Sequence, residues 1–146
     1  MPGDPFDLRR FVDAQEEAGA YARALAELRG GHKRSHWIWF VFPQIAGLGS
    51  SEMARIYAIL SLAEARAYLD HPVLGPRLAE CAEALLALPT RDPVAVLGGI
   101  DAMKLRSSMT LFSRVRDAAP VFARVLDEFY GGDIDGATEQ LLSGPA

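Results

Sequence analysis

Short stretches with apolar residues three or four positions apart recur along the chain, and glycine or proline separates one stretch from the next. The stretch 18–29, for example, places Tyr21, Leu25 and Leu28 at this spacing and is followed by two glycines. Such spacing puts the apolar side chains on one face of an α-helix, and glycine commonly follows a last helical turn. We therefore expect an all-α domain, a compact array of about eight short helices that bury their apolar faces together.

Residues that can cap a helix stand before several of these stretches. Aspartate and serine side chains accept hydrogen bonds from the free N–H groups of a first helical turn. The predicted caps are Asp7, Ser61 together with Glu64, Asp92 before Pro93, Asp101 and Asp135. Apolar spacing predicts further helices over about 52–60, 77–88 and 120–130.

The segment 35–43, Ser-His-Trp-Ile-Trp-Phe-Val-Phe-Pro, has features of both a strand and a helix. Aromatic and β-branched residues favour a strand, whereas Ser35 is a good helix N-cap. Because the run is apolar on both faces, its periodicity does not separate the two alternatives. No partner strand is apparent elsewhere in the sequence, so we predict a short buried helix.

The length of 146 residues fits a single domain, with an ordered core expected over about 7–142. Half of the residues are hydrophobic, so the chain can bury a core. The longest strongly apolar run, 37–42, is too short to span a bilayer, and no apolar signal-peptide core follows the N-terminus. The single Cys81 cannot form an internal disulfide. Together these features predict a cytoplasmic protein that does not associate with a membrane.

Charge and motif content exclude several functional classes. A formal net charge of −4 argues against general nucleic-acid binding, which needs clustered positive charge. The sequence contains no HExxH, CxxC, Walker A, GxSxG or Rossmann motif, so neither a metal site nor a cofactor is predicted. It gives no indication of an oligomeric state.

Polar residues around the two tryptophans form a first candidate ligand-binding segment. Trp37 and Trp39 are two positions apart, so their side chains point in different directions and one can pack inward while the other lines a cleft. An indole with an exposed face can stack on a base or another flat ring. Lys33 and His36 precede the tryptophans and Gln44 follows them, where they could orient polar groups of a ligand. The alternative interpretation is a packed aromatic core with polar ends.

The segment 101–108 is a second candidate. If a helix begins at Asp101, its free N–H groups favour a phosphate or a carboxylate. Lys104 would lie in the first turn, where a cation opposes the helix dipole unless an anion compensates. Ser107 and Ser108 add hydroxyl groups one turn later. The alternative is an aspartate cap with Lys104 paired to an internal carboxylate. We expect the segments 33–44 and 101–108 to meet in space.

Several blocks of the chain resemble the bacterial domain-of-unknown-function 1810 family. They are Lys33-Arg34-Ser35-His36-Trp37, Phe42-Pro43-Gln44, Gly47-Leu48-Gly49, Tyr57-Ala58-Ile59, Glu64-Ala65, His71-Pro72-Val73-Leu74-Gly75 and the run from Lys104 to Phe112. The resemblance covers about 7–142 and implies a compact, mostly α-helical cytosolic domain with no established activity. Members are sometimes labelled calpastatin, but no feature of this chain indicates a calpain inhibitor.

A shorter pattern resembles the NADAR group, helical proteins tied to NAD and ADP-ribose metabolism that include N-glycosidases. The residues in the order of that group's pattern are Glu52, Ile59, Glu64-Ala65 and Lys104-Leu105. This resemblance implies a nucleotide-like ligand whose phosphate Lys104 would hold. In a glycosidic cleavage a carboxylate stabilises an oxocarbenium-like centre or activates water, and Glu52 and Asp101 are the candidate catalytic residues.

Two classes of function therefore remain open. One is a domain that binds or hydrolyses a nucleotide-like small molecule related to NAD or ADP-ribose. The other is a non-enzymatic protein-interaction module, in which the same residues build the core and a partner surface. A binder should gather the two segments around partly buried polar groups, whereas an interaction module should expose apolar side chains.

Overall fold

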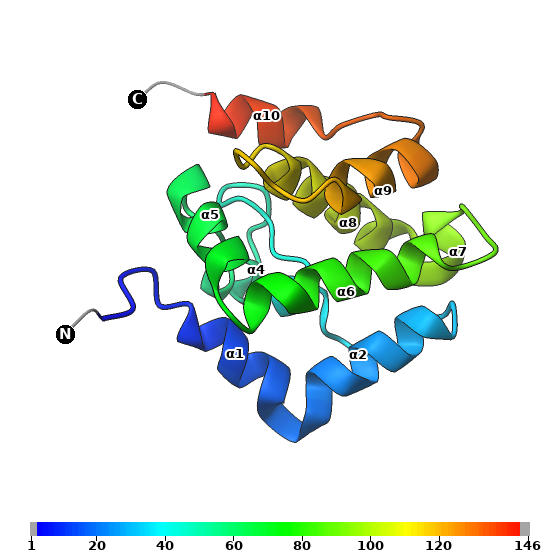
Figure 1. The fold of residues 1–146 in the computed structure, drawn as a ribbon, viewed down its shortest axis with the longest axis horizontal. Coiled ribbons are helices and arrows are strands. Elements are labelled where there is room, and N and C mark those ends of the chain that lie inside the picture. Colours follow the sequence, from blue (N-terminus) through cyan, green and yellow to red (C-terminus); the bar gives the residue numbers. More distant parts are fainter. Residues whose placement is uncertain (1–2, 144–146) are drawn as a thin grey trace.

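The computed structural model describes residues 3–143, and within that range α-helices and one short 3-10 helix make up the regular structure. The predicted all-α class is therefore confirmed (Figure 1). In chain order the helices are α1 (Arg9–Glu16), η1 (Glu17–Gly19), α2 (Ala20–Arg29), α3 (Ile38–Val41), α4 (Glu52–Ile56), α5 (Leu62–Asp70), α6 (Leu74–Leu86), α7 (Pro93–Leu97), α8 (Gly99–Ser113), α9 (Val121–Tyr130) and α10 (Gly136–Leu142).

Helix α6 crosses the middle of the fold, with α1 and α2 on one side and α8, α9 and α10 on the other (Figure 1). It packs against α2, α5 and α9, while α8 packs against α3, α5, α7, α9 and α10. A chain of buried aromatic rings joins these layers: Phe11 contacts Tyr68, Tyr68 contacts Phe112, and Phe112 contacts Phe122, with centroid distances of 5.1, 5.2 and 6.1 Å. Within 3–143, no helix has the length and apolarity needed to cross a membrane.

The ambiguous segment 35–43 contains the short helix α3, and the prediction of a buried helix is confirmed. Ile38, Phe40 and Val41 are buried. The predicted cap is wrong, because Trp37 occupies the N-cap position and makes no side-chain capping bond. The Ser35 hydroxyl instead donates to Glu27, 2.6 Å away on α2.

Three of the predicted caps are confirmed and two are wrong. The side chains of Ser61, Asp92 and Asp135 accept hydrogen bonds from the first turns of α5, α7 and α10. Leu8 rather than Asp7 is the N-cap residue of the first helix, and the Asp4 carboxylate accepts from the N–H groups at positions 8 and 9.

Helix α8 begins three residues earlier than the predicted cap at Asp101 implied. Its N-cap is Gly98, which has a φ of 87°, and its first residue is Gly99. Asp101 therefore lies in the first turn and is not the cap. Lys104 lies beyond that turn, so the dipole at the helix N-terminus opposes its charge less than the sequence indicated.

The turn between α5 and α6 brings two backbones into close contact at Gly75. The His71 Nδ1 atom accepts hydrogen bonds from the N–H groups of Val73 and Leu74, which holds the turn in place. A Cβ atom on Gly75 would lie 2.0 Å from the carbonyl oxygen of Leu69. Only glycine fits between these helices without a shift of the backbone.

We expect Gly75→Ala to lower the free energy of unfolding by about 3 kcal/mol, because the added methyl group meets rigid backbone rather than a movable side chain. Gly99→Ala is the matched control, since a Cβ there has no neighbour within 4 Å and the residue is the first of a helix. Urea unfolding of both variants measures the difference. Equal stabilities would contradict the close approach at position 75.

Candidate functional site

The two candidate segments meet where α8 packs against α3 and the loop before it, as the sequence predicted. The Lys33 ammonium lies 2.9 Å from the Asp101 carboxylate, and the Lys104 ammonium lies 5.2 Å from the centre of the Trp39 ring. We call this contact region the lysine–tryptophan junction. Its members are Lys33, Trp37, Trp39, Asp101, Lys104 and Ser108.

Both lysines and both tryptophans of the chain lie in this junction. The Lys33 ammonium is 5.0 Å from the centre of the Trp37 ring, which parallels the pair formed by Lys104 and Trp39. A cation over an aromatic face is attracted by the ring quadrupole. The other thirteen basic residues, counting Lys and Arg together, are all arginines. The positions of the two lysines in the sequence could therefore have pointed to this region.

The half of the junction around Lys33 has its hydrogen bonds and charges satisfied within the protein. The Lys33 side chain is 8% exposed and that of Asp101 is 18% exposed. The ammonium also donates to the carbonyl oxygen of Ser35 at 2.6 Å. Trp37 is buried, so the prediction that it could stack on a ligand is not supported by its position.

Glu27 organises this half, and sequence reasoning missed it. Its carboxylate accepts hydrogen bonds from the backbone N–H groups of Arg34 and Ser35, the Ser35 hydroxyl and the Trp37 Nε1 atom, at 2.6–3.1 Å. Burial raises the pKa of Glu27, but these hydrogen bonds outweigh it and bring the pKa to about 2. In the sequence Glu27 looks like an ordinary polar residue of α2, because its partners all follow the end of that helix.

The half of the junction around Lys104 differs, because its polar groups lack acceptors. We call Trp39, Lys104 and Ser108 the open half. The Trp39 Nε1 atom and the Ser108 hydroxyl are buried without a hydrogen-bond partner, and Lys104 has no ion pair among residues 3–143. Lys104 and Ser108 are four positions apart on α8, so they share the helix face that carries Asp101 toward Lys33. Buried donors without acceptors are rare and unfavourable in proteins.

The remaining predicted site residues are placed elsewhere. His36 is exposed, and Glu52 is exposed in the first turn of α4. The backbone carbonyl oxygen of Gln44 accepts a hydrogen bond from the N–H group of Ile59, next to an isolated β-bridge between Ile45 and Ile59. The Ser107 hydroxyl donates to Asp135 at 2.9 Å. In the described part of the chain, no hydrogen bond or ion pair joins these four residues to the junction.

Glu64, which contributed to the NADAR-like pattern, belongs to a separate structural network. Its buried carboxylate lies 2.9 Å from Arg10 and also accepts from the N–H group of Leu60. The guanidinium of Arg10 donates to four backbone carbonyl oxygens as well. All groups of this network are paired, so it ties α1 to α5. Among residues 3–143, no group of three His, Cys, Asp or Glu side chains could hold a metal ion.

Comparisons with known proteins agree with the first resemblance and give no support to the second. The chain matches, over residues 5–142, the family described as "Protein of unknown function (DUF1810)". The structure is similar to the crystal structure at 1.38 Å of the conserved hypothetical protein Rv1873 from Mycobacterium tuberculosis. That similarity has a TM-score of 0.93 at 50% sequence identity and covers 97% of this chain and 100% of the other.

No curated protein matches the chain. Neither the NADAR resemblance nor the calpastatin label finds support in these comparisons. The family match spans nearly the whole chain, and the solved relative has the same fold over nearly its full length. The chain belongs to the DUF1810 family of proteins of unknown function.

Proposed function

We propose that this domain binds a small anionic molecule at the open half of the junction, with a nucleotide-like phosphate compound related to ADP-ribose as the ligand class. One observation carries the proposal: the buried Trp39 Nε1 and Ser108 hydroxyl donors lack acceptors, the Lys104 ammonium lies 5.2 Å from the centre of the Trp39 ring, and Ser108 lies one turn after Lys104 on α8. The remainder of the junction is already paired internally.

The chemistry of these groups favours an oxyanion. An indole N–H and an ammonium can only donate, and a serine hydroxyl can donate as well. A phosphate supplies several strong acceptor oxygens and a negative charge, which complements all three groups. Since Trp37 is buried, Trp39 is the indole of the junction that remains partly exposed. Only Trp39 could therefore contact the flat ring of a nucleotide.

Binding is a better fit to this geometry than hydrolysis. The Asp101 carboxylate is engaged by Lys33 at 2.9 Å, which leaves it poorly placed to attack a substrate or to activate water. Glu52 lies exposed on α4 and has no hydrogen bond or ion pair to the junction in the described range. The proposal therefore assigns a binding role to Lys104, Trp39 and Ser108 and no catalytic role to either carboxylate.

A protein-interaction module is the second candidate, and exposed apolar side chains beside the junction favour it. Val94 on α7 and Ile100 and Met103 on α8 are 54%, 73% and 67% exposed. Ile100 and Met103 directly precede Asp101 and Lys104 in the sequence, so a partner that covered them would contact α8 close to the junction.

We expect Lys104→Met to reduce the affinity for ADP-ribose by about 1.5–3 kcal/mol, the range for hydrogen bonds to charged groups. The stability of the unliganded protein should change by less than about 0.5 kcal/mol, because Lys104 has no internal ion pair among residues 3–143. Calorimetric titration with inorganic phosphate, ADP-ribose and NAD measures the affinities, and thermal unfolding measures stability, which saturating ligand should raise.

Arg34→Met is the control for a general loss of positive charge, since Arg34 is exposed and lies one residue from Lys33. It should bind ADP-ribose as the unaltered protein does. Equal affinities of Lys104→Met and the unaltered protein would contradict the proposed site. Failure of all three ligands to bind the unaltered protein would favour the interaction module.

A further inference from the structure

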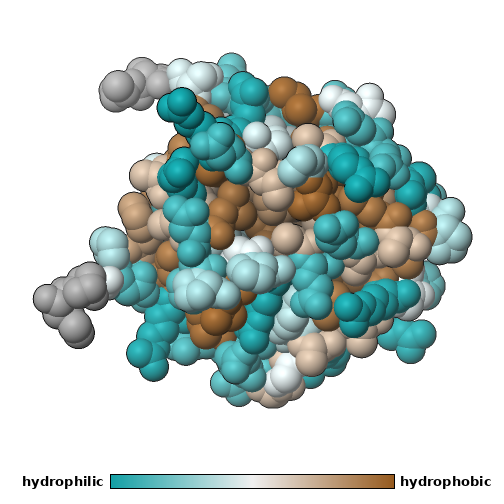
Figure 2. Space-filling view, in the orientation of Figure 1, coloured by the Kyte–Doolittle hydropathy of each residue, from teal (hydrophilic) through white to brown (hydrophobic). Residues whose placement is uncertain are grey.

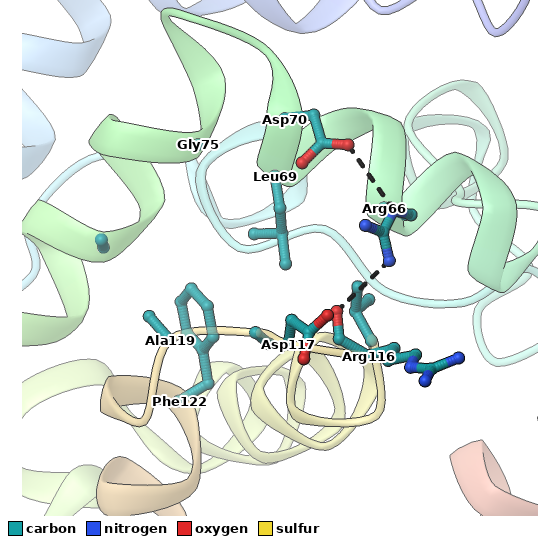
Figure 3. Close-up of a pocket in the computed structure, with 11 residues that line it drawn as sticks. Arg66, Leu69, Asp70, Gly75, Arg116, Asp117, Ala119 and Phe122 are labelled. Carbon is teal, nitrogen blue, oxygen red and sulfur yellow. Dashed lines mark hydrogen bonds and ion pairs between the residues drawn. The ribbon is translucent and has the colours of Figure 1, made fainter.

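A hollow lies between α5, α6 and the loop from α8 to α9, and none of the junction residues lines it (Figure 3). Its volume is about 240 Å³, and Leu69, Val115 and Phe122 supply apolar surface at its base. Figure 2 shows hydrophobic residues in the area between α5, α6 and α9, bordered by hydrophilic ones. This volume lies below the roughly 300–1,000 Å³ of typical ligand pockets, which limits the ligand to a small molecule.

Charges of both signs stand at the rim of this hollow. Arg66 and Asp70 come from α5, and Asp117 comes from the loop. Figure 3 shows that the side chain of Leu69 points between these charged groups and Phe122. The guanidinium of Arg116 points away, whereas its carbonyl oxygen faces Arg66.

The charged groups at the rim have weak partners within the protein. Arg66 lies 3.7 Å from the Asp70 carboxylate and donates to the Arg116 carbonyl oxygen at 3.4 Å. Both distances exceed the roughly 2.7–2.9 Å of a strong charge-assisted hydrogen bond. Asp117 takes part in no hydrogen bond or ion pair of the described residues, and its φ of 64° is unusual for a residue other than glycine. A cation, Arg66, and an anion, Asp117, therefore remain available at the rim, next to the apolar side chains of Leu69 and Phe122.

We propose that this hollow binds an α-amino acid with an apolar side chain, at a site separate from the anion site of the junction. Arg66 binds the carboxylate, and Asp117 binds the ammonium. The apolar side chain packs on Leu69 and Phe122. A ligand with only one charge pairs with only one of these two residues, so the pair of opposite charges selects a zwitterion.

Three probes with the same branched apolar group separate these contributions: L-leucine, isocaproate, which lacks the amine, and isoamylamine, which lacks the carboxylate. Titrations are followed by calorimetry with the full chain. We expect saturable binding of L-leucine and at least about tenfold weaker binding of the two singly charged probes.

Two variants test the roles of the charged residues. Arg66→Met should weaken L-leucine binding about 10- to 100-fold and leave isoamylamine binding unchanged. Asp117→Asn should weaken L-leucine by a similar factor and leave isocaproate unchanged. Asparagine tolerates a positive φ, so this change removes the charge without straining the loop.

Arg9→Met is the matched control, because Arg9 and Asp13 form an i,i+4 pair at 3.7 Å, the same spacing and distance as Arg66 and Asp70. It should bind all three probes as the unaltered protein does. Thermal unfolding should show that every variant is folded, since the substituted side chains are exposed. The proposal would be overturned if L-leucine showed no saturable binding to the unaltered protein. It would also be overturned if both rim variants bound each of the three probes as tightly as the unaltered protein does.

Discussion

Lys33→Met is expected to lower the free energy of unfolding by about 3 kcal/mol. The change removes the partner of the Asp101 carboxylate, which is only 18% exposed and lies 2.9 Å from the Lys33 ammonium. A charge left unpaired in a mostly buried position is strongly destabilising. The same substitution at Lys104 should change the free energy of unfolding of the unliganded protein very little. Of the two lysines of the chain, we therefore expect Lys33 to stabilise the fold and Lys104 to bind the ligand.

Denaturant unfolding of the two lysine variants provides the comparison. The double variant with Lys33→Met and Asp101→Asn should recover part of the lost stability, because the stranded charge is then gone. Equal unfolding midpoints for Lys33→Met and the unaltered protein would show that the ion pair contributes nothing, and would contradict the structural role assigned to this half of the junction.

Glu27→Gln is expected to lower the free energy of unfolding by about 2–4 kcal/mol at neutral pH. The carboxylate accepts four hydrogen bonds, those from Arg34, the Ser35 backbone and Trp37 at Oε1 and that from the Ser35 hydroxyl at Oε2. An amide keeps the acceptor at Oε1 but carries no charge, and its NH2 group replaces Oε2. The Ser35 hydroxyl would lose its acceptor, and the hydrogen bonds from the Trp37 indole and the backbone N–H groups of the loop would lose their charge assistance. The loop from α2 to α3 should therefore loosen.

The effect of Glu27→Gln should depend on pH. The pKa of Glu27 is lowered from an ordinary value of 4.5 to about 2 in the folded protein. Its contribution to stability is therefore fully present above about pH 4.5 and is lost as the pH falls toward 2.

Urea unfolding of the unaltered protein and the variant at neutral and acidic pH should show the stability gap narrowing below 4.5. Glu83→Gln, an exposed glutamate on α6, is the control and should show no such gap. If the difference in free energy of unfolding between the unaltered protein and Glu27→Gln were the same at all pH values, the stabilising role of the hydrogen bonds to the Glu27 carboxylate would be contradicted.

The ends of the helices could be predicted from the sequence where the capping contacts involve residues close in the chain. Ser61, Asp92 and Asp135 cap as predicted because their partners lie two or three positions away. Ser35 and Asp101 failed as caps because distant residues hold them: Ser35 donates to Glu27, and Asp101 pairs with Lys33. Competition between local and distant partners is a tertiary effect that periodicity does not report.

The sequence predicted that two segments meet at the candidate site. It did not predict which side chains form ion pairs and hydrogen bonds with one another there. The sequence indicated that one tryptophan would pack inward and one would not, and the structure places Trp37 inward. Which lysine pairs with Asp101 depends on the orientation of α8 against the loop before α3. Glu27 was missed because four donors converge on it only after the chain turns back at the end of α2.

The most direct test of anion binding uses the two indole N–H groups of the chain, which give two separate cross-peaks in a proton–nitrogen correlation spectrum. The Trp39→Phe variant assigns them. On titration with ADP-ribose, we expect the Trp39 signal to shift and saturate, because its N–H group gains an acceptor. The Trp37 signal should stay nearly constant, since that group already donates to Glu27 at 2.8 Å. A Trp39 signal that does not move at saturating ligand would contradict the proposed site.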